Sequence, residues 1–203
     1  LLKGVRNAAG PEPAIMVDAN MSYDLDNAVD VAAACADAAV TFIEEPVRAP
    51  SLGEYVELYS ELRRRLPAAL MLAGGEGFAS PQDFALMAER GALDICQPDC
   101  VSLGGIGATI EAARIAAAAG RAVVPHISCA SVGAVAMSAT LHAAMAMETC
   151  GWFEYDAHAP ESRLRSELFR GVVEPRRGRV EPSTAPGHGV ELVEGAIEKY
   201  LIS

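Results

Sequence analysis

The chain is poor in basic residues. It has 16 lysines and arginines against 27 aspartates and glutamates, which gives a net charge of −11. Nucleic acids and anionic membrane surfaces attract clustered positive charge, so this balance argues against both as partners. It also means that an anionic substrate would need cations placed locally at its site.

Long apolar runs are absent as well. Although 51% of the 203 residues are hydrophobic, no stretch reaches the roughly 18 consecutive apolar residues of a membrane span. The first ten residues, LLKGVRNAAG, are too mixed in character for a signal peptide. This length and composition predict a globular chain that forms one domain or a large part of one.

Closely spaced cysteine pairs are also missing. The number of cysteines is odd, and no C-x-x-C motif occurs among Cys35, Cys96, Cys100, Cys129 and Cys150. Each cysteine lies among apolar or small residues. We therefore expect buried thiols in a reducing, cytoplasmic environment rather than disulfides or a zinc site.

Strand-like and helix-like segments alternate along the chain. The segments that predict strands are 14–20, 40–46, 69–76, 93–99, 121–128 and 151–156. The helical segments between them are 27–39, 52–66, 80–91, 108–120 and 131–147, with Ser80 as the expected N-cap of the third. Apolar strands alternating with helices indicate a parallel sheet covered on both faces. A doubly wound sheet and a (β/α) barrel both fit this pattern.

Each predicted strand ends in a charged or ionisable residue. These residues are Asp18, Glu44, Glu76, Asp99, His126 and Glu154. An open sheet would spread them along a line, whereas a barrel brings all strand ends into one ring, where barrel enzymes keep their active sites. The pattern therefore favours an α/β fold of the TIM-barrel type. Because a complete eight-unit barrel takes about 250 residues, we expect its first strands to precede Leu1.

Three of these strand ends carry carboxylates in succession, at Asp18, Glu44 and Glu76. Such acids cannot lie close together without a cation, and hard oxygen ligands suit Mg²⁺, with Mn²⁺ as a substitute. Side-chain alternation places Glu44 and Glu45 on opposite faces of their strand but does not decide which one enters the mouth. The same alternation places Asn20 on the side of Asp18, where it could bond a ligand or substrate.

Asp99 and His126 end neighbouring predicted strands. That separation suits a carboxylate–imidazole hydrogen bond, which fixes the tautomer of the ring and raises its basicity. We interpret the pair as functional rather than structural. Arg48 follows the second strand in a loop at the mouth and could bind a distal carboxylate of the substrate, although a solvated loop arginine fits equally well.

The motifs at these positions resemble those of a known family. MVDAN, FIEEP, GGE, QPD followed by LGGIG, PHIS, GWFEYD and PGHGVEL, in this order, resemble the enolase superfamily and, within it, the mandelate racemase subgroup. The resemblance implies a modified (β/α)7β barrel in which Mg²⁺ is held by Asp18, Glu44 and Glu76. It also implies a catalytic pair of Asp99 and His126, with Glu154 as an acid toward the substrate carboxylate.

The resemblance also has a missing part. The family normally has an amino-terminal capping domain and a K-x-K motif at the second barrel strand, and neither occurs in these residues. We expect residues 1–160 to form the C-terminal part of the barrel and residues 161–203 to form a tail that packs toward a capping domain. The family resemblance further implies a homo-oligomer.

The implied chemistry is abstraction of the proton alpha to a carboxylate, with an enediolate intermediate stabilised by Mg²⁺ and a protonated Glu154. The intermediate either expels a β-hydroxyl or is reprotonated from the other face. Because racemisation or epimerisation needs two bases and only His126 is visible, we rank dehydration of a small sugar acid first. A third alternative is a catalytically incomplete barrel fragment, and the 203-residue chain alone is expected to show neither activity.

Overall fold

Five parallel strands form the sheet of this protein. The computed structural model describes residues 1–127, 133–148, 150–155 and 159–200. The strands are β1 (Met16–Asp18), β2 (Phe42–Glu44), β3 (Met71–Gly74), β4 (Ile95–Cys96) and β5 (Ala122–Val123), paired in the order β1-β2-β3-β4-β5. A doubly wound sheet reverses its strand order at a switch point, and this sheet does not. The predicted barrel portion is therefore confirmed.

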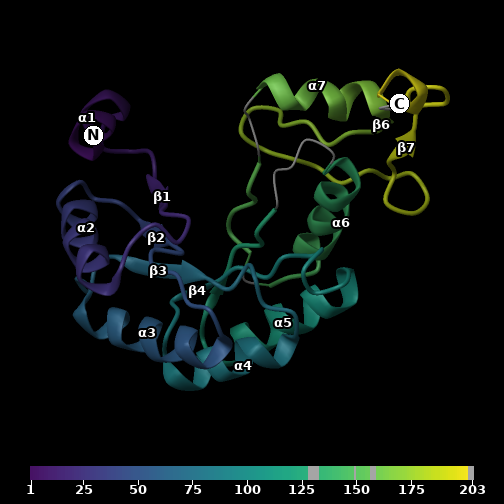
Figure 1. Ribbon diagram of the computed structural model, residues 1–203. Coiled ribbons are helices and arrows are strands. Elements are labelled where there is room, and N and C mark those ends of the chain that lie inside the picture. The colour runs from purple at the N-terminus through teal and green to yellow at the C-terminus, as the bar shows by residue number, and fades with distance from the viewer. Residues whose placement is uncertain (128–132, 149, 156–158, 201–203) are drawn as a thin grey trace.

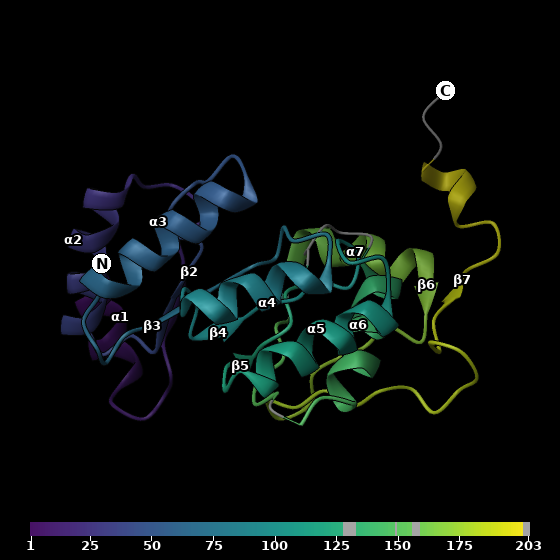
Figure 2. The ribbon, with the colours of Figure 1, turned by 90° about the horizontal axis from the view of Figure 1, so that it is seen from below.

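One helix precedes the first strand, and the other helices follow strands along the chain. They are α1 (Leu2–Ala9), α2 (Leu25–Asp37), α3 (Leu52–Arg65), α4 (Pro81–Arg90), α5 (Ile106–Ala118), α6 (Ala134–Met145) and α7 (Ala159–Leu168). Figure 1 shows α2, α3, α4 and α5 following one another around the curved sheet, so that the layers form an arc open between α1 and α7. The view from below shows the same succession, with the C-terminal tail on the side far from α1 (Figure 2).

Side-chain capping fixes where the outer helices begin. Asp24 and Ser51 each accept a hydrogen bond from a backbone amide in the first turn of α2 and α3. Ser80 is the N-cap of α4, as predicted, and forms a capping box with Asp83. These caps set the loops that connect the mouth of the barrel to its outer layer.

Alternation along the strands separates two apolar layers. Ile43, Leu72, Cys96 and Val123 belong to the large core between the sheet and the helices. Their strand neighbours form a smaller cluster on the inner face, made of Phe42, Ala73, Ile95 and Val124. Because side chains repeat every second residue, Glu44 continues the inner row that begins at Phe42, and Glu45 continues the outer row.

The sixth predicted strand is wrong. Residues 151–155 form no strand, and only the preceding Cys150 makes an isolated parallel bridge, to Val123. The amide of Ile127 donates to the Glu154 carboxylate at 2.8 Å, so it is engaged by a side chain where a ladder would need a backbone partner. The bridge therefore does not extend into a strand.

The C-terminal region contains elements that the sequence analysis did not predict. Helix α7 crosses the boundary expected at residue 160, and the tail adds an antiparallel pair, β6 (Phe169–Arg170) with β7 (Glu191–Leu192), and a 3₁₀ turn at Ile197–Tyr200. Ile127, Met137, Leu141 and Val173 form a third apolar cluster, which joins α6 to this tail.

The cysteines of the described residues are free thiols, as expected. Cys35, Cys96 and Cys100 are buried and Cys150 is half-buried, whereas Cys129 lies outside the described residues. Across the part of the chain that the structure describes, no helix combines the length and the apolar character needed to cross a membrane.

Candidate active site

The two adjacent acids at the end of β2 point in opposite directions. Glu44 is the last residue of the strand and lies on the inner face. Glu45 has a left-handed backbone with φ of 38° and is 1% exposed. Its carboxylate accepts hydrogen bonds from the amide of Gly75 and from the hydroxyls of Tyr55 and Tyr59. Glu44 alone is therefore available to the mouth of the barrel.

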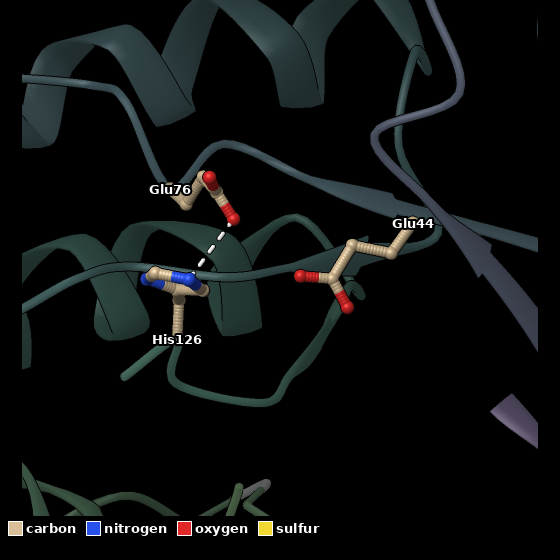
Figure 3. Close-up of side chains that lie close together, drawn as sticks. All are labelled: Glu44, Glu76 and His126. Atoms are coloured by element: carbon tan, nitrogen blue, oxygen red, sulfur yellow. Dashed lines mark ion pairs between the residues drawn. The ribbon is translucent and has the colours of Figure 1, made fainter. Parts of the chain in front are cut away.

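Glu44 meets two residues that follow β3 and β5. One ligand atom each from Glu44, Glu76 and His126 lie within 4.8 Å of one another. Glu76 Oε2 is 3.1 Å from His126 Nε2. Figure 3 shows this ion pair, with the Glu44 carboxylate directed toward it from β2. Residues separated by tens of positions thus converge at one end of the sheet.

His126 is held from its other nitrogen by Asp99. The Nδ1–Oδ2 distance is 2.9 Å, and Asp99 Oδ1 accepts the amides of Val101 and Ser102 at 2.8 Å each. Burial favours a lower pKa for His126, but the bond to Asp99 and the charges of Glu76 and Glu154 outweigh it and raise the pKa to about 9. Burial alone would raise the pKa of Asp99, but these hydrogen bonds lower it. The predicted pairing of Asp99 with His126 is present.

Glu154 comes from the segment after α6 and lies near His126 and Glu44, whose pKa values its charge helps to raise. Its carboxylate accepts the Ile127 amide at 2.8 Å. Burial raises the pKa of Glu154, although the bond from Ile127 and the charge of His126 oppose the shift. A carboxyl group whose pKa is raised is more readily protonated, which is the state that an acid toward a substrate oxygen requires.

Asp18 lies at one side of this group. It ends β1, directly opposite Glu44 in the strand register, and it is exposed. Its Oδ1 accepts the amide of Asn20 at 2.7 Å. Its charge contributes to the raised pKa values of Glu44 and Glu76. Asp18 is thus near the acids of the mouth but outside the closest group, and its role as a ligand stays a prediction.

Asn20 and Arg48 occupy exposed positions. Asn20 has a left-handed backbone with φ of 44°, and its amide bonds Asp18 as described above. Arg48 lies in the loop after β2. The prediction that these residues bind substrate stays a prediction for both.

Gln97 belongs to the site, and the sequence analysis missed it. It is 2% exposed and lies on the inner face, two residues after Ile95. Its side chain bonds the Glu44 carboxylate, while its Oε1 has no hydrogen-bond partner among the described residues. The same period of two that placed Glu44 could have found it. An unpaired buried oxygen is an acceptor for a donor that a ligand would bring.

The donor set of the mouth fits a hard divalent cation. Burial is the main cause that raises the pKa of Glu44 to about 7; the Gln97 bond opposes it, and the charges of Glu154, Asp18 and Glu76 add to it. Burial and mutual repulsion both disfavour the charged form of these carboxylates, and a bound cation would offset both effects. Oxygen ligands of this kind suit Mg²⁺ more than zinc. The residues present therefore fit the implied metal.

These pKa values predict how stability depends on pH in the metal-free chain. The pKa of Glu44 rises from 4.5 to about 7, so its stabilising contribution is lost between those values. The pKa of His126 rises from 6.5 to about 9, so its contribution is lost over that higher range. Both effects lower the stability of the folded chain as the pH rises. We expect the unfolding temperature to fall by about 5 °C or more between pH 5.5 and pH 9.

Differential scanning calorimetry in the presence of a chelator measures this fall. Added Mg²⁺ is expected to reduce the fall, because it neutralises the acids that become charged as the pH rises. A metal-free unfolding temperature that increases over this pH range would contradict the electrostatic description of the site.

The fold and the site together define a class of protein. An inner ring of acids opposite a His–Asp pair, at the carboxyl ends of consecutive parallel strands, is typical of a barrel active site. A family model described as enolase C-terminal domain-like matches residues 1–196. The chain belongs to this family, within the enolase superfamily, and the resemblance found in its motifs is confirmed.

The chain is also similar to individual proteins. It is 28% identical over 199 residues to an arabinonate dehydratase from Saccharolobus solfataricus, covering 98% of this chain and 50% of that protein. It is similar to the L-talarate/galactarate dehydratase of Salmonella typhimurium, with 29% identity, a TM-score of 0.79, and coverage of 97% and 45%. It is also similar to the L-talarate dehydratase of Polaromonas sp. JS666, whose structure is a complex with Mg and L-glucarate. The identity is 26%, the TM-score is 0.79, and the match covers 97% of this chain and 50% of that one. The chain thus spans about half the length of these relatives.

Proposed function

We propose that the protein dehydrates a sugar acid by Mg²⁺-dependent abstraction of the proton alpha to its carboxylate. The observation that carries the proposal is the His126–Asp99 pair placed against the acids Glu44 and Glu76. The similarity to two kinds of sugar-acid dehydratase supports the substrate class.

Asp18, Glu44 and Glu76 would hold the cation. Glu44 and Glu76 lie together, and Asp18 is the strand neighbour of Glu44. A bound Mg²⁺ would supply positive charge to the substrate carboxylate, which makes the α-proton more acidic. A cation held by these acids would draw the Glu76 carboxylate from His126 Nε2, which would leave that nitrogen free to face a substrate.

His126 is the proposed base, acting as the neutral imidazole. A cation held at Glu76 would offset the Glu76 charge, which is one of the causes of the raised pKa of His126 in the metal-free chain. Asp99 bonds Nδ1 and so directs Nε2 toward Glu76 and the mouth of the barrel, where it takes the α-proton of a bound substrate. As the C–H bond breaks, negative charge grows on the substrate carboxylate, and a protonated Glu154 donates a hydrogen bond to it. The imidazolium of His126 then gives the same proton to the departing β-hydroxyl, which leaves as water. The resulting enol rearranges to a 2-keto-3-deoxy acid.

Racemisation or epimerisation of a 2-hydroxy acid is the second candidate, because it begins with the same abstraction. It requires a second base on the opposite face of the substrate. Among the described residues that line this mouth, His126 is the one we assign as a base, so dehydration ranks first.

A screen of sugar acids tests the proposal. The whole protein that contains these 203 residues is incubated with Mg²⁺ and a library that includes arabinonate, talarate, galactarate and glucarate, and keto-acid formation is followed. We expect at least one acid to be dehydrated, with loss of activity when a chelator removes the metal. If no member yields a keto acid while a 2-hydroxy acid without a β-hydroxyl is racemised, the dehydratase assignment fails.

The Asp99→Asn variant provides a second test. Asp99 acts on the imidazole and not on the cation, so the rate is expected to fall by about 10²-fold or more while the Mg²⁺ affinity changes by less than about threefold. Steady-state kinetics and calorimetric titration measure the two quantities on the same variant. Equal losses in both would contradict the role given to Asp99.

A further inference from the structure

Glu45 forms a buried hydrogen-bond cluster that the proposed chemistry does not use. Its Oε1 accepts the Tyr55 hydroxyl and the Gly75 amide, both at 2.7 Å, and its Oε2 accepts the Tyr59 hydroxyl at 2.6 Å. The carbonyl oxygen of Val47 lies 3.1 Å from the same Tyr59 hydroxyl and is the alternative acceptor for its single proton. One carboxylate therefore joins helix α3 to the segment that follows β3.

The segment after β3 fits tightly into this cluster. A Cβ on Gly74 would collide with the Tyr55 hydroxyl and lie 2.8 Å from Glu45 Oε1. Gly75 has φ of 102°, and a Cβ there would lie 2.9 Å from Phe84 and 3.1 Å from Phe78. Both positions accept glycine alone, which allows the backbone to approach the carboxylate directly. The next residue in the chain is Glu76.

The cluster is backed by stacked aromatic rings. Tyr55 and Tyr59 are stacked with ring centroids 3.8 Å apart, and Phe78 meets Tyr55 edge-on at 5.1 Å. Phe78 in turn meets Phe84 of α4 at 5.0 Å. The groups that bond Glu45 are thus fixed by packing against two helices.

The backbone conformation of Glu45 also indicates that its surroundings hold it in place. A left-handed conformation costs a residue other than glycine of the order of 1 kcal/mol or more, and it persists where the surrounding structure compensates. The φ of 38° at Glu45 turns its side chain into the outer layer while Glu44 stays on the inner face. The three hydrogen bonds to Glu45 supply that compensation.

We propose that Glu45 is a positioning residue that holds the Gly75 amide, and thereby the Glu76 carboxylate, in place opposite Glu44. The inference rests on the proposed function in one respect, namely that Glu44 and Glu76 bind the cation. Without the cation these two acids repel each other. The bond from Gly75 to Glu45 keeps them close enough for a divalent ion to bind without first ordering the loop.

Three variants separate positioning from general stability. Glu45→Gln keeps an oxygen for Tyr55 and Gly75, and its amide group can donate to the Tyr59 hydroxyl, which still donates to Val47. Glu45→Met removes the acceptor and leaves the Tyr55 hydroxyl and the Gly75 amide unpaired, while Tyr59 keeps the Val47 carbonyl, and the two buried donors endanger folding. The triple variant Glu45→Met, Tyr55→Phe and Tyr59→Phe removes the hydroxyls as well, so that the Gly75 amide is the donor left unpaired and the Val47 carbonyl loses the Tyr59 hydroxyl.

Two measurements are made on the full chain carrying each change. Hydrogen–deuterium exchange reports the protection of the Gly75 amide without metal, and calorimetric titration with Mg²⁺ reports the affinity of the site. In the triple variant we expect exchange at Gly75 to be at least about tenfold faster and Mg²⁺ binding about 10- to 100-fold weaker. Glu45→Gln is expected to remain within about threefold of the unmodified chain in both.

A control addresses loss of stability. Leu62 is fully buried on α3, about one turn beyond Tyr59, and makes no hydrogen bond to the Glu45 cluster through its apolar side chain. Leu62→Ala is expected to lower the unfolding temperature while leaving Mg²⁺ affinity and Gly75 exchange unchanged. If Glu45 had a merely structural role, the Mg²⁺ affinity would decrease together with the unfolding temperature in all variants, including Leu62→Ala.

The outcomes distinguish this inference from the proposed function. Wild-type exchange at Gly75 in the folded triple variant overturns the inference, whatever the metal does. Faster exchange with unchanged Mg²⁺ affinity overturns it as well, because the segment would then move without affecting the site. Failure of the unmodified chain to bind Mg²⁺, with the exchange result intact, contradicts the metal site of the proposed function and leaves the hold of Glu45 on Gly75 supported.

Discussion

Replacement of His126 by asparagine is expected to abolish dehydration and the exchange of the substrate α-proton with solvent deuterium. Both processes need the same proton abstraction, and a positioned general base contributes about 10²- to 10⁴-fold to a rate. Asparagine can still bond Asp99, so the surrounding geometry is preserved. The measurement is proton NMR of the substrate in deuterium oxide, with the whole protein and Mg²⁺.

The racemase alternative makes a different forecast for the same variant. A racemase has a second base on the other face of the substrate, so the His126→Asn protein would still exchange the α-proton of one enantiomer. Testing both enantiomers therefore separates the two reactions. Retention of dehydration at more than about a tenth of the original rate would contradict the assignment of His126 as the base.

Loss of Mg²⁺ binding is the second large effect, and it is expected for Glu44→Gln. The change removes a charge at the point where the acids converge, and calorimetric titration should show at least about 100-fold weaker binding. Asp18→Asn and Glu76→Gln are expected to weaken binding in the same direction. Glu45→Gln is the matched control, because it lies one residue away on the opposite face of β2.

The same titration tests which residues are ligands. Ligand atoms of Glu44, Glu76 and His126 lie within 4.8 Å of one another, which permits a site made of two acids and an imidazole. We expect His126→Asn to keep its Mg²⁺ affinity, because Mg²⁺ prefers oxygen and Asp18 lies beside Glu44 in the register. A larger loss from His126→Asn than from Asp18→Asn would contradict the predicted ligand set.

The sequence predicted the parts of the fold that follow from periodicity. Apolar runs separated by helical segments predicted the succession of β1 to β5, and capping chemistry predicted the start of α4 at Ser80. The segment 151–156 failed because it was judged by its apolar residues alone. The bond from the Ile127 amide to the Glu154 side chain is a long-range contact that local pattern does not contain.

The site residues that end strands were predicted from the sequence. The residues that support them through hydrogen bonds were not. Alternation limited the choice between Glu44 and Glu45 to one of them, and the family resemblance selected Glu44. What alternation could not supply is the positive φ at Glu45 or the tyrosines of α3 that bond it, since both arise from packing between layers. Gln97 was missed because the sequence analysis selected charged or ionisable residues, and the side chain of Gln97 is a neutral amide.

The central claim is that the acids and the His126–Asp99 pair of this chain remove an α-proton from a sugar acid in a Mg²⁺-dependent way. The most direct measurement follows the α-proton signals of the sugar-acid library by NMR in deuterium oxide, with the whole protein, first with Mg²⁺ and then with an excess of chelator. The account predicts that the α-proton of at least one acid disappears with Mg²⁺ and persists with chelator. Loss of the signal at the same rate in both conditions, or no loss from any acid, would contradict it.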